Sequence, residues 1–382
     1  MAPIVIIGAG MAAYGLAREF RKLDKATPLT IVTGDSGAAY AKPMLSNAFA
    51  LGKGAAQLVS GSAEQMAAQL GAEIQAHTTV LAIDTAERTV VTDRGSLAYS
   101  KLVLALGANP IRLPLAGDAA DAVLSVNHIA DYAAMRERLA AIDGKARVAI
   151  LGAGLIGCEF ADDLSAAGHQ VTLVDPNPRP LAALAAPGLS EGLAQAWQGK
   201  PVLLALGTTA ASVSRSGAAL QVTLADGRAV EADVVLSAVG LRPSIALAQS
   251  AQLLTRRGIV VDQYGRTSCE DVYALGDCAE FAEAGVLPYV APMLAAARAI
   301  ASTLAGTPVA IELKTDAVIV KTPSYRLALA PPPVGTEGEW VHEVTEERTV
   351  ARFVDADGAV RGFGLSAPVP AVRQKLLAEL VA

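Results

Sequence analysis

The sequence predicts an α/β protein with two Rossmann-like, three-layer nucleotide-binding domains and a small α+β domain at the C-terminal end. A short strand followed by a glycine-rich turn and a helix occurs twice, starting before Gly8 and again before Gly152. Each copy is followed by a hairpin and a further strand. At about 150 residues per domain, the 382 residues are enough for two or three domains.

The first copy opens with residues 3–7, an apolar run of β-branched residues typical of a parallel strand buried on both faces. The GxGxxA sequence of residues 8–13 follows, and a helical pattern continues to about Leu23. The next strand is expected at residues 29–32. Together these segments form a βαβ unit.

The second copy has the same order. A strand at residues 147–151 leads into the GxGxxG sequence of residues 152–157, and a helix continues through Ala167. The strand at residues 170–174 ends at Asp175. A single GxGxxG sequence is weak evidence, but two copies with matching surroundings make coincidence a poor explanation.

Both copies also close in the same way. Hairpin turns are expected at Arg94-Gly95 and at Asp226-Gly227, and Asp-Gly between alternating apolar residues is a strong hairpin signal. Apolar strands then lead to Gly107 and to Gly240.

Each glycine-rich turn predicts a pyrophosphate site, because glycine allows the backbone to approach the phosphates and the N–H groups at the helix start attract negative charge. Asp175 is placed to accept hydrogen bonds from an adenosine ribose and to repel a 2′-phosphate, which favours NADH over NADPH. A solvated aspartate at a strand end is the alternative. The first copy has no acid at this position, and either Thr33 or Asp35 is left as the ribose contact.

A later segment predicts a further ligand contact. Residues 272–276 are expected to form a short strand that ends at Asp277. Ligands of open α/β sheets bind beyond the carboxyl ends of the strands, so the Asp277 carboxylate could bind a sugar-alcohol hydroxyl such as those of ribityl.

Composition excludes several classes of protein. A net charge of −6 argues against a general nucleic-acid binder, and 52% apolar with 18% charged residues excludes a disordered chain. The longest uncharged stretch, residues 1–17, is short for a membrane span and lacks the basic start of a secretion signal. We therefore expect no membrane partner and a cytoplasmic location.

The order of these motifs resembles the two-dinucleotide flavoprotein reductases of the glutathione reductase type. The motifs are GxGxxA at residues 8–13, LALG at 104–107, GxGxxGxE at 152–159, SAVGLRP at 237–243 and TSxxxVYALGD at 267–277. The resemblance implies FAD bound by residues 1–111 and 242–311, and NADH bound by residues 112–241. Residues 312–382 form the third domain.

The resemblance also implies the contact residues. Those for FAD are Gly8, Ala9, Gly10, Met11, Ala12, Ala13, Thr33, Lys42, Val80, Ala105, Gly107, Asp277, Val290 and Lys321. Those for NAD are Gly152, Gly154, Leu155, Ile156, Gly157, Glu159, Asp175 and Gly240.

Lys42 and Glu159 are the catalytic candidates. In the family the position of Lys42 faces the flavin, where a cation could stabilise negative charge on the reduced ring and pair with Glu159. By the same resemblance Glu159 orients the nicotinamide. The alternatives are a surface lysine and an acid favoured near a helix N-terminus. Pro292 is expected to begin a helix over residues 293–304 whose positive end faces the flavin, and Lys321 could add to this effect.

No cysteine pair suits a disulfide relay. The sequence has no CxxxxC, residues 40–46 contain no thiol, and Cys158, Cys269 and Cys278 are expected to be structural. Electrons must then leave the flavin directly, which suits a one-electron protein carrier.

The Lys42-Pro43 segment and residues 320–323 are similar to rubredoxin reductases and their flavorubredoxin-reducing relatives. Dioxygenase-type ferredoxin reductases usually carry an aromatic, Trp-containing segment where residues 313–321 have none. Rubredoxin is therefore the expected carrier, supplying an alkane hydroxylase or an oxidative-stress system. Ferredoxin, in a dioxygenase-type system, is the alternative carrier. An NADH oxidase and a nonenzymatic NADH-sensing flavoprotein are two further alternatives.

For the remaining residues the sequence predicts structural roles only. The four histidines are isolated, no metal is expected, and Trp197 and Trp340 are expected to be packing groups. In the third domain, strands at residues 317–320, 340–344, 350–354 and 362–365 precede a helix from about residue 371 to 380. In disulfide reductases this domain forms the dimer interface, and its short form here is compatible with a monomer.

Overall fold

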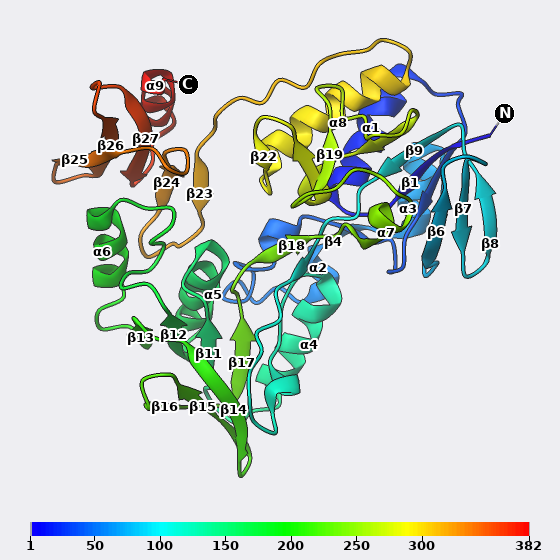
Figure 1. Ribbon diagram of the computed structural model, residues 1–382. Coiled ribbons are helices and arrows are strands. Elements are labelled where there is room, and N and C mark those ends of the chain that lie inside the picture. The colour runs from blue at the N-terminus through cyan, green and yellow to red at the C-terminus, as the bar shows by residue number, and fades with distance from the viewer. Residues whose placement is uncertain (1, 382) are drawn as a thin grey trace. The chain divides into compact units, whose positions relative to one another are not determined.

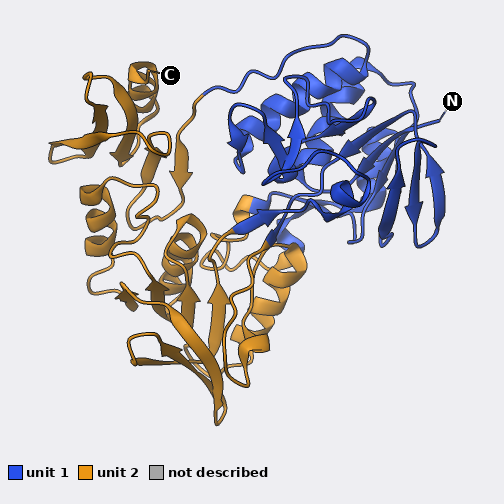
Figure 2. Cartoon of the chain, in the orientation of Figure 1, with its two compact units in different colours: residues 1–42, 56–109, 241–314 blue, residues 43–55, 110–240, 315–382 orange. Residues whose placement is uncertain are grey.

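The computed structural model describes residues 2–381 and divides into two compact units. Unit 1 comprises residues 1–42, 56–109 and 241–314, and unit 2 comprises residues 43–55, 110–240 and 315–382 (Figure 2). The C-terminal residues and the short segment 43–55 thus group with the second glycine-rich turn. The division into three domains stays a prediction.

Unit 1 contains a five-stranded parallel sheet in the order β20-β9-β1-β2-β5. The neighbouring strands β1 and β9 of this sheet are labelled in Figure 1. The central strand β1 is buried along its whole length, as expected of a parallel strand that is covered on both faces. The strands are β1 (Ile4–Ile7), β2 (Leu29–Val32), β5 (Glu73–Gln75), β9 (Lys101–Leu104) and β20 (Val272–Ala274).

Helices α1 (Met11–Leu23) and α8 (Val290–Leu304) of this unit pack against each other. Their approach is close because the facing residues are small: a Cβ added to Gly15 would lie 3.9 Å from the Ala297 Cβ atom. The alanines of α8 therefore account for part of the apolar content of the chain as helix packing.

The other elements of unit 1 surround this core. They are β3 (Ala39–Tyr40), β4 (Val59–Gly61), α3 (Ala63–Leu70), β6 (Val80–Asp84), β7 (Thr89–Thr92), β8 (Gly95–Ala98), α7 (Ala246–Ser250), β19 (Ile259–Val261), β21 (Ala279–Phe281) and β22 (Gly285–Val286). Elements α2 (Ala55–Leu58), β10 (Ala108–Pro110) and β18 (Leu241–Pro243) lie where the chain passes between units.

Unit 2 contains a four-stranded parallel sheet in the order β13-β12-β11-β17. Its strands are β11 (Arg147–Leu151), β12 (Gln170–Asp175), β13 (Val202–Leu206) and β17 (Val234–Ser237). Its helices are α4 (Ile129–Ala140), α5 (Leu155–Ala166) and α6 (Pro187–Ala196). A three-stranded antiparallel sheet, β14 (Ala210–Ser216), β15 (Ala219–Leu224) and β16 (Ala229–Ala232), contains the predicted Asp226-Gly227 hairpin.

The C-terminal part of unit 2 forms a five-stranded antiparallel sheet in the order β23-β24-β27-β26-β25, with helix α9 (Pro370–Glu379). The strands are β23 (Val318–Val320), β24 (Leu327–Ala330), β25 (Gly338–Val344), β26 (Thr349–Asp355) and β27 (Val360–Ser366). The predicted elements are present, and both the α/β class and the small α+β domain are confirmed.

Strand β24 and the start of helix α8 differ from the sequence prediction. Strand β24 was not predicted, because its Leu-Ala-Leu-Ala sequence carries little β propensity and it is buried between its partners β23 and β27. Helix α8 begins at Val290, two positions before Pro292. Proline is tolerated there because the first four N–H groups of a helix have no intrahelical acceptor.

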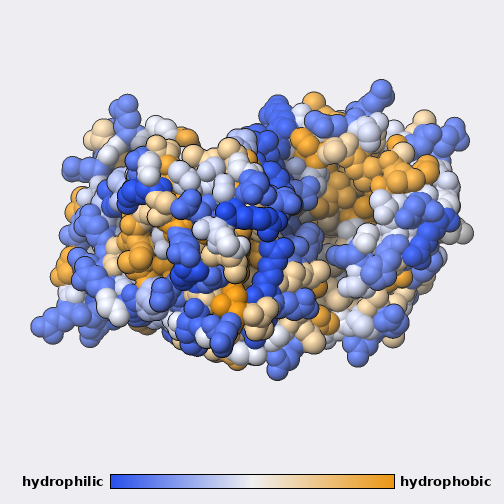
Figure 3. Space-filling model, turned by 90° about the horizontal axis from the view of Figure 1, so that it is seen from below, coloured by the Kyte–Doolittle hydropathy of each residue, from blue (hydrophilic) through white to orange (hydrophobic). Residues whose placement is uncertain are grey.

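The surface and the helix lengths bear on membrane association. Within residues 2–381, each helix is too short or too polar to cross a bilayer. On the face shown in Figure 3, hydrophobic groups form patches among hydrophilic ones.

Candidate nucleotide-binding sites

The first glycine-rich turn connects β1 to α1. Gly8 has a φ of +109°, and a Cβ atom added to it would lie 2.3 Å from the Ala105 carbonyl oxygen, so only glycine fits. A Cβ added to Gly10 would meet no atom within 4 Å, so there is open space at the second glycine of the motif. Ala13 is fully buried in the third position of the motif.

The second turn connects β11 to α5 and repeats this division of roles. Gly152 has a φ of +105°, and an added Cβ would lie 2.6 Å from the Ala238 carbonyl oxygen, whereas Gly154 faces open space. A Cβ on Gly157 would lie 1.9 Å from the Gly152 carbonyl oxygen, so the third glycine lets α5 start directly against the turn.

Both helices present uncapped N-termini at these turns. Neither α1 nor α5 has a side-chain cap or an acidic residue in its first turn. The free N–H groups and the helix dipole therefore favour an anion beside Gly10 and Gly154. These features fit the pyrophosphate groups of two dinucleotides.

Asp277 lies close to the first turn. It follows β20, and a Cβ added to the preceding Gly276 would be 2.9 Å from the Ala12 Cβ atom. The side chain is half-buried, and no group within residues 2–381 donates a hydrogen bond to its carboxylate. Its oxygens are therefore available to the hydroxyl groups of a ligand.

The residues after β2 form a compact turn. The Thr33 hydroxyl donates to Asp35 Oδ1 over 2.8 Å, and the Gly37 N–H group donates to the same oxygen over 2.9 Å. The Tyr14 hydroxyl donates to the Gly37 carbonyl. Burial, and to a smaller extent the negative charge of Asp35, raises the pKa of Tyr14 to about 12. Asp35 is exposed, whereas Thr33 is buried, and the contact of either residue with a ribose stays a prediction.

Asp175 lies at the end of β12, beside the second turn, and is only 8% exposed. Its Oδ2 atom accepts a hydrogen bond from the Ala153 N–H group over 2.7 Å. Its Oδ1 atom accepts from the backbone N–H and the side-chain amide of Asn177, both over 2.8 Å.

Glu159 is fully buried on α5 and binds two segments of unit 2. The Ser46 hydroxyl donates to Glu159 Oε2 over 2.5 Å, and the Lys321 backbone N–H donates to Oε1 over 2.9 Å. The Lys321 ammonium lies 3.0 Å from Oε2 and also donates to the Pro43 carbonyl oxygen. Glu159 thus joins residues 43–46 to Lys321, and its predicted pairing with Lys42 stays a prediction.

Two further carboxylates of α5 are buried in the same way. Asp163 accepts from the N–H groups of Phe49 and Ala50 over 2.8 and 2.9 Å. Asp162 accepts from Trp197 Nε1 over 2.8 Å and from the Ser324 N–H over 3.0 Å. Neither aspartate was singled out from the sequence. The available signal was a pair of acids within a helix whose remaining residues are mostly apolar or small.

The other predicted residues lie at strand and helix ends. Lys42 is half-buried in a 3₁₀ turn (Lys42–Met44), Val80 begins β6, and Val290 is 40% exposed at the start of α8. Gly107 and Gly240 have φ values of +66° and +108° after β9 and β17. Their contacts with the coenzymes stay predictions.

The cysteines differ in exposure. Cys158 and Cys278 are fully buried, and burial raises the pKa of both thiols, that of Cys278 to about 11. Both therefore stay protonated at neutral pH and donate weakly to backbone carbonyl groups. Cys269 is half-buried.

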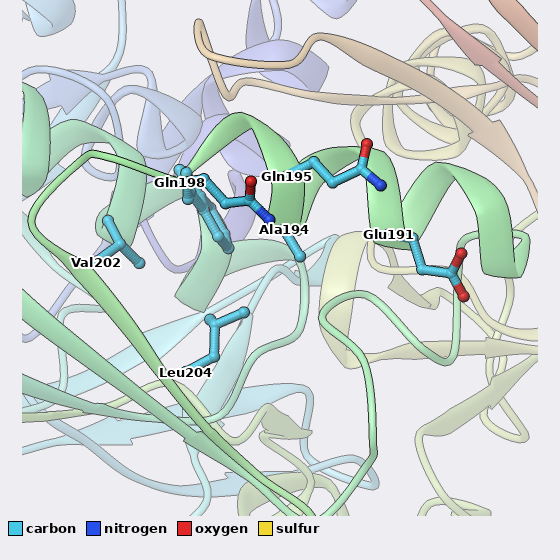
Figure 4. Close-up of a pocket in the computed structure, with 7 residues that line it drawn as sticks. Glu191, Ala194, Gln195, Gln198, Val202 and Leu204 are labelled. Atoms are coloured by element: carbon cyan, nitrogen blue, oxygen red, sulfur yellow. The ribbon is translucent and has the colours of Figure 1, made fainter.

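Figure 4 shows a pocket along α6 and β13 of unit 2. It is lined by Glu191, Ala194, Gln195, Trp197, Gln198, Val202 and Leu204. None of the predicted coenzyme contacts is among these residues.

Comparisons with known proteins cover the whole chain. A family model described as pyridine nucleotide-disulphide oxidoreductase matches residues 2–302, and one described as rubredoxin binding C-terminal domain matches residues 310–380. The chain is 44% identical to a Rubredoxin-NAD(+) reductase of Alcanivorax borkumensis, and the aligned region covers 100% of this chain and 99% of that relative. It is 43% identical to the protein of that name from Acinetobacter baylyi, and that aligned region covers 100% of this chain and 98% of the relative.

A solved structure extends the comparison to the fold. The ferredoxin reductase for the CYP199A2 system from Rhodopseudomonas palustris is 26% identical, with a TM-score of 0.87 over 96% of this chain and 91% of that chain. The predicted family resemblance and fold class are confirmed by these matches.

The contact between Gly157 and Gly152 gives a first prediction. Gly157→Ala is expected to weaken NAD⁺ binding at least about tenfold and to destabilise the protein by about 1–3 kcal/mol, because the added methyl group must displace α5 from the turn. Gly15→Ala is the control, since its Cβ would make ordinary contacts at 3.9 Å. Calorimetric titration and thermal unfolding measure both; wild-type affinity in Gly157→Ala contradicts the assigned packing role.

Asp163 gives a prediction on pH. Burial raises the pKa of its carboxyl group, opposed by the hydrogen bonds from Ala50 and Phe49. The folded protein therefore holds the Asp163 proton more tightly than the unfolded chain does. The stability that this proton contributes is fully present below the ordinary aspartate pKa and is lost as the pH rises through the raised pKa of the folded protein. Asp163→Asn cannot titrate, so the free energy of unfolding of the variant relative to wild type should improve as pH rises from about 4 to about 7.

Urea denaturation at several pH values tests this expectation. Asp143→Asn, at an exposed position, is the control for loss of one charge. A constant difference between Asp163→Asn and wild type over the pH range contradicts the assignment.

Proposed function

Because this chain belongs to the pyridine nucleotide-disulphide oxidoreductase family, we propose that it oxidises NADH and passes the electrons through FAD, one at a time, to rubredoxin. The observation that carries the proposal is similarity over the full length to the rubredoxin-NAD(+) reductases, including the C-terminal residues 310–380. A match to the nucleotide-binding part alone would support an oxidoreductase without indicating its carrier.

The two glycine-rich turns have separate roles in this proposal. The turn at Gly8–Gly10 binds the FAD pyrophosphate and Asp277 accepts hydrogen bonds from the ribityl hydroxyl groups. The turn at Gly152–Gly154 binds the NADH pyrophosphate. Bound FAD supplies the conversion between a two-electron hydride donor and a one-electron acceptor.

The remaining candidates act by charge and position. Lys42 supplies positive charge to the flavin site, while Glu159 holds Lys321 and the segment that follows Lys42. The buried, protonated state of Cys158 and Cys278 supports direct transfer to the carrier without a thiol relay.

Ferredoxin is the second candidate carrier, favoured by the structural similarity to a ferredoxin reductase. The higher identity to the rubredoxin-NAD(+) reductases supports rubredoxin instead. We further propose a monomer in the cytoplasm that binds neither nucleic acid nor membranes.

Anaerobic stopped-flow measurements test the function. The protein with bound FAD should lose its yellow absorbance within milliseconds of mixing with NADH, and rubredoxin should reoxidise it faster than ferredoxin. Faster reoxidation by ferredoxin supports the second carrier, and turnover with oxygen alone supports an oxidase. A protein that binds NADH but is reduced only slowly contradicts the enzymatic proposal.

Lys42→Met tests the role of the lysine. Loss of the cation should slow reduction by NADH at least about tenfold, with little change in FAD affinity, because the charge is needed as the flavin is reduced. Lys25→Met, at an exposed position in unit 1, is the control. Reduction of Lys42→Met at the wild-type rate removes this residue from the mechanism.

A further inference from the structure

Both polar backbone groups of Ala153 are held by the protein itself. The Ala153 N–H donates to Asp175 Oδ2 over 2.7 Å. The Ala153 carbonyl oxygen accepts from the Leu181 N–H over 2.8 Å and from the Cys158 thiol over 3.2 Å. Ala153 is the middle residue of the Gly-Ala-Gly turn and is 2% exposed, so hydrogen bonds within the protein hold the centre of this turn.

The first turn lacks this arrangement. Its middle residue is Ala9, and among residues 2–381 no side chain accepts a hydrogen bond from the Ala9 N–H group. The residue that follows β2 is Thr33, whose hydroxyl donates to Asp35. The carboxylate that holds the turn is therefore specific to the second copy.

The hydrogen bonds of Asp175 show how its carboxylate is used. Three protein donors occupy it: the Ala153 N–H, the Asn177 N–H and the Asn177 side-chain amide. A carboxylate has about four acceptor positions, so about one remains, on Oδ2, for a ribose hydroxyl. Bonds from N–H groups to a charged carboxylate are also stronger than neutral ones.

We propose that Asp175 is a positioning residue, which holds the second glycine-rich turn in its binding conformation while NADH is absent. The inference rests on the proposed function, in which NADH enters and NAD⁺ leaves in every turnover. A turn that is ordered beforehand avoids the entropic cost of ordering at each binding event. A flavin that stays bound through turnover can order its own turn, which accounts for the difference between the two copies.

Asp175→Asn is the informative variant, because asparagine keeps the size but has a single acceptor oxygen where aspartate accepts on both sides. Amide hydrogen exchange is measured on the FAD-bound, NADH-free protein. Amides of residues 151–158 should exchange at least about tenfold faster in Asp175→Asn than in wild type. Asp226→Asn is the control, since Asp226 is exposed and pairs with Arg228 in the same unit.

Binding of NAD⁺ and of 2′-deoxy-NAD⁺ separates this role from ribose recognition. A positioning role predicts that Asp175→Asn weakens both ligands by the same factor, about tenfold or more. An effect that vanishes with 2′-deoxy-NAD⁺, together with unchanged exchange of the turn, assigns Asp175 to the ribose and overturns the proposal.

The wild-type protein supplies a measurement that does not depend on the folding of a variant. If the turn is ordered beforehand, saturating NAD⁺ adds little protection to the Ala153 amide; a large gain in protection overturns the proposal. None of these measurements uses an electron carrier, so they test the role of Asp175 even if the protein does not reduce rubredoxin. A wild-type protein that binds no NAD⁺ contradicts the proposed function, while the exchange of the turn still reports on Asp175.

Discussion

Burial of three carboxylates on α5 is the constraint on which unit 2 depends. Moving a charged group out of water is costly unless it is paired and hydrogen-bonded. Glu159, Asp162 and Asp163 meet this requirement with donors from two distant stretches of chain, residues 46–50 and 321–324. The helix that starts at the second glycine-rich turn therefore also fixes the segment after Lys42 and the entry to the C-terminal sheet.

The glycine-rich turns show how one backbone plan serves two coenzymes. In both, the first glycine lies against a neighbouring carbonyl group and the second faces open space. They differ in the third position, alanine in one and glycine in the other, and in the residue that ends the second strand. Such differences set how closely the helix approaches the turn and how the turn is supported, while the site for the phosphates is kept.

Much of the fold could be predicted because its signals are local. The strands before Gly8 and Gly152 are continuous apolar runs, and the glycines themselves mark the turns. Contacts across long separations gave no such signal. Glu159 and Ser46 are 113 positions apart, and nothing in either neighbourhood indicates that they meet. Asp162 and Asp163 resemble solvent-facing helix residues until their hydrogen-bond donors are known, and β24 is a strand because β23 and β27 pair with its two edges.

The interleaving of the two units has a consequence for synthesis of the protein. Strand β20 completes the edge of the first sheet, yet it follows the whole of the second sheet along the chain. The nascent chain must therefore hold an incomplete first sheet while the inserted part is made. Glu159 and Asp162 also wait for donors at residues 321 and 324, whereas the donors to Asp163 are made before α5. Neither unit corresponds to one continuous fragment, so neither unit can be produced alone by cutting the chain at a single peptide bond.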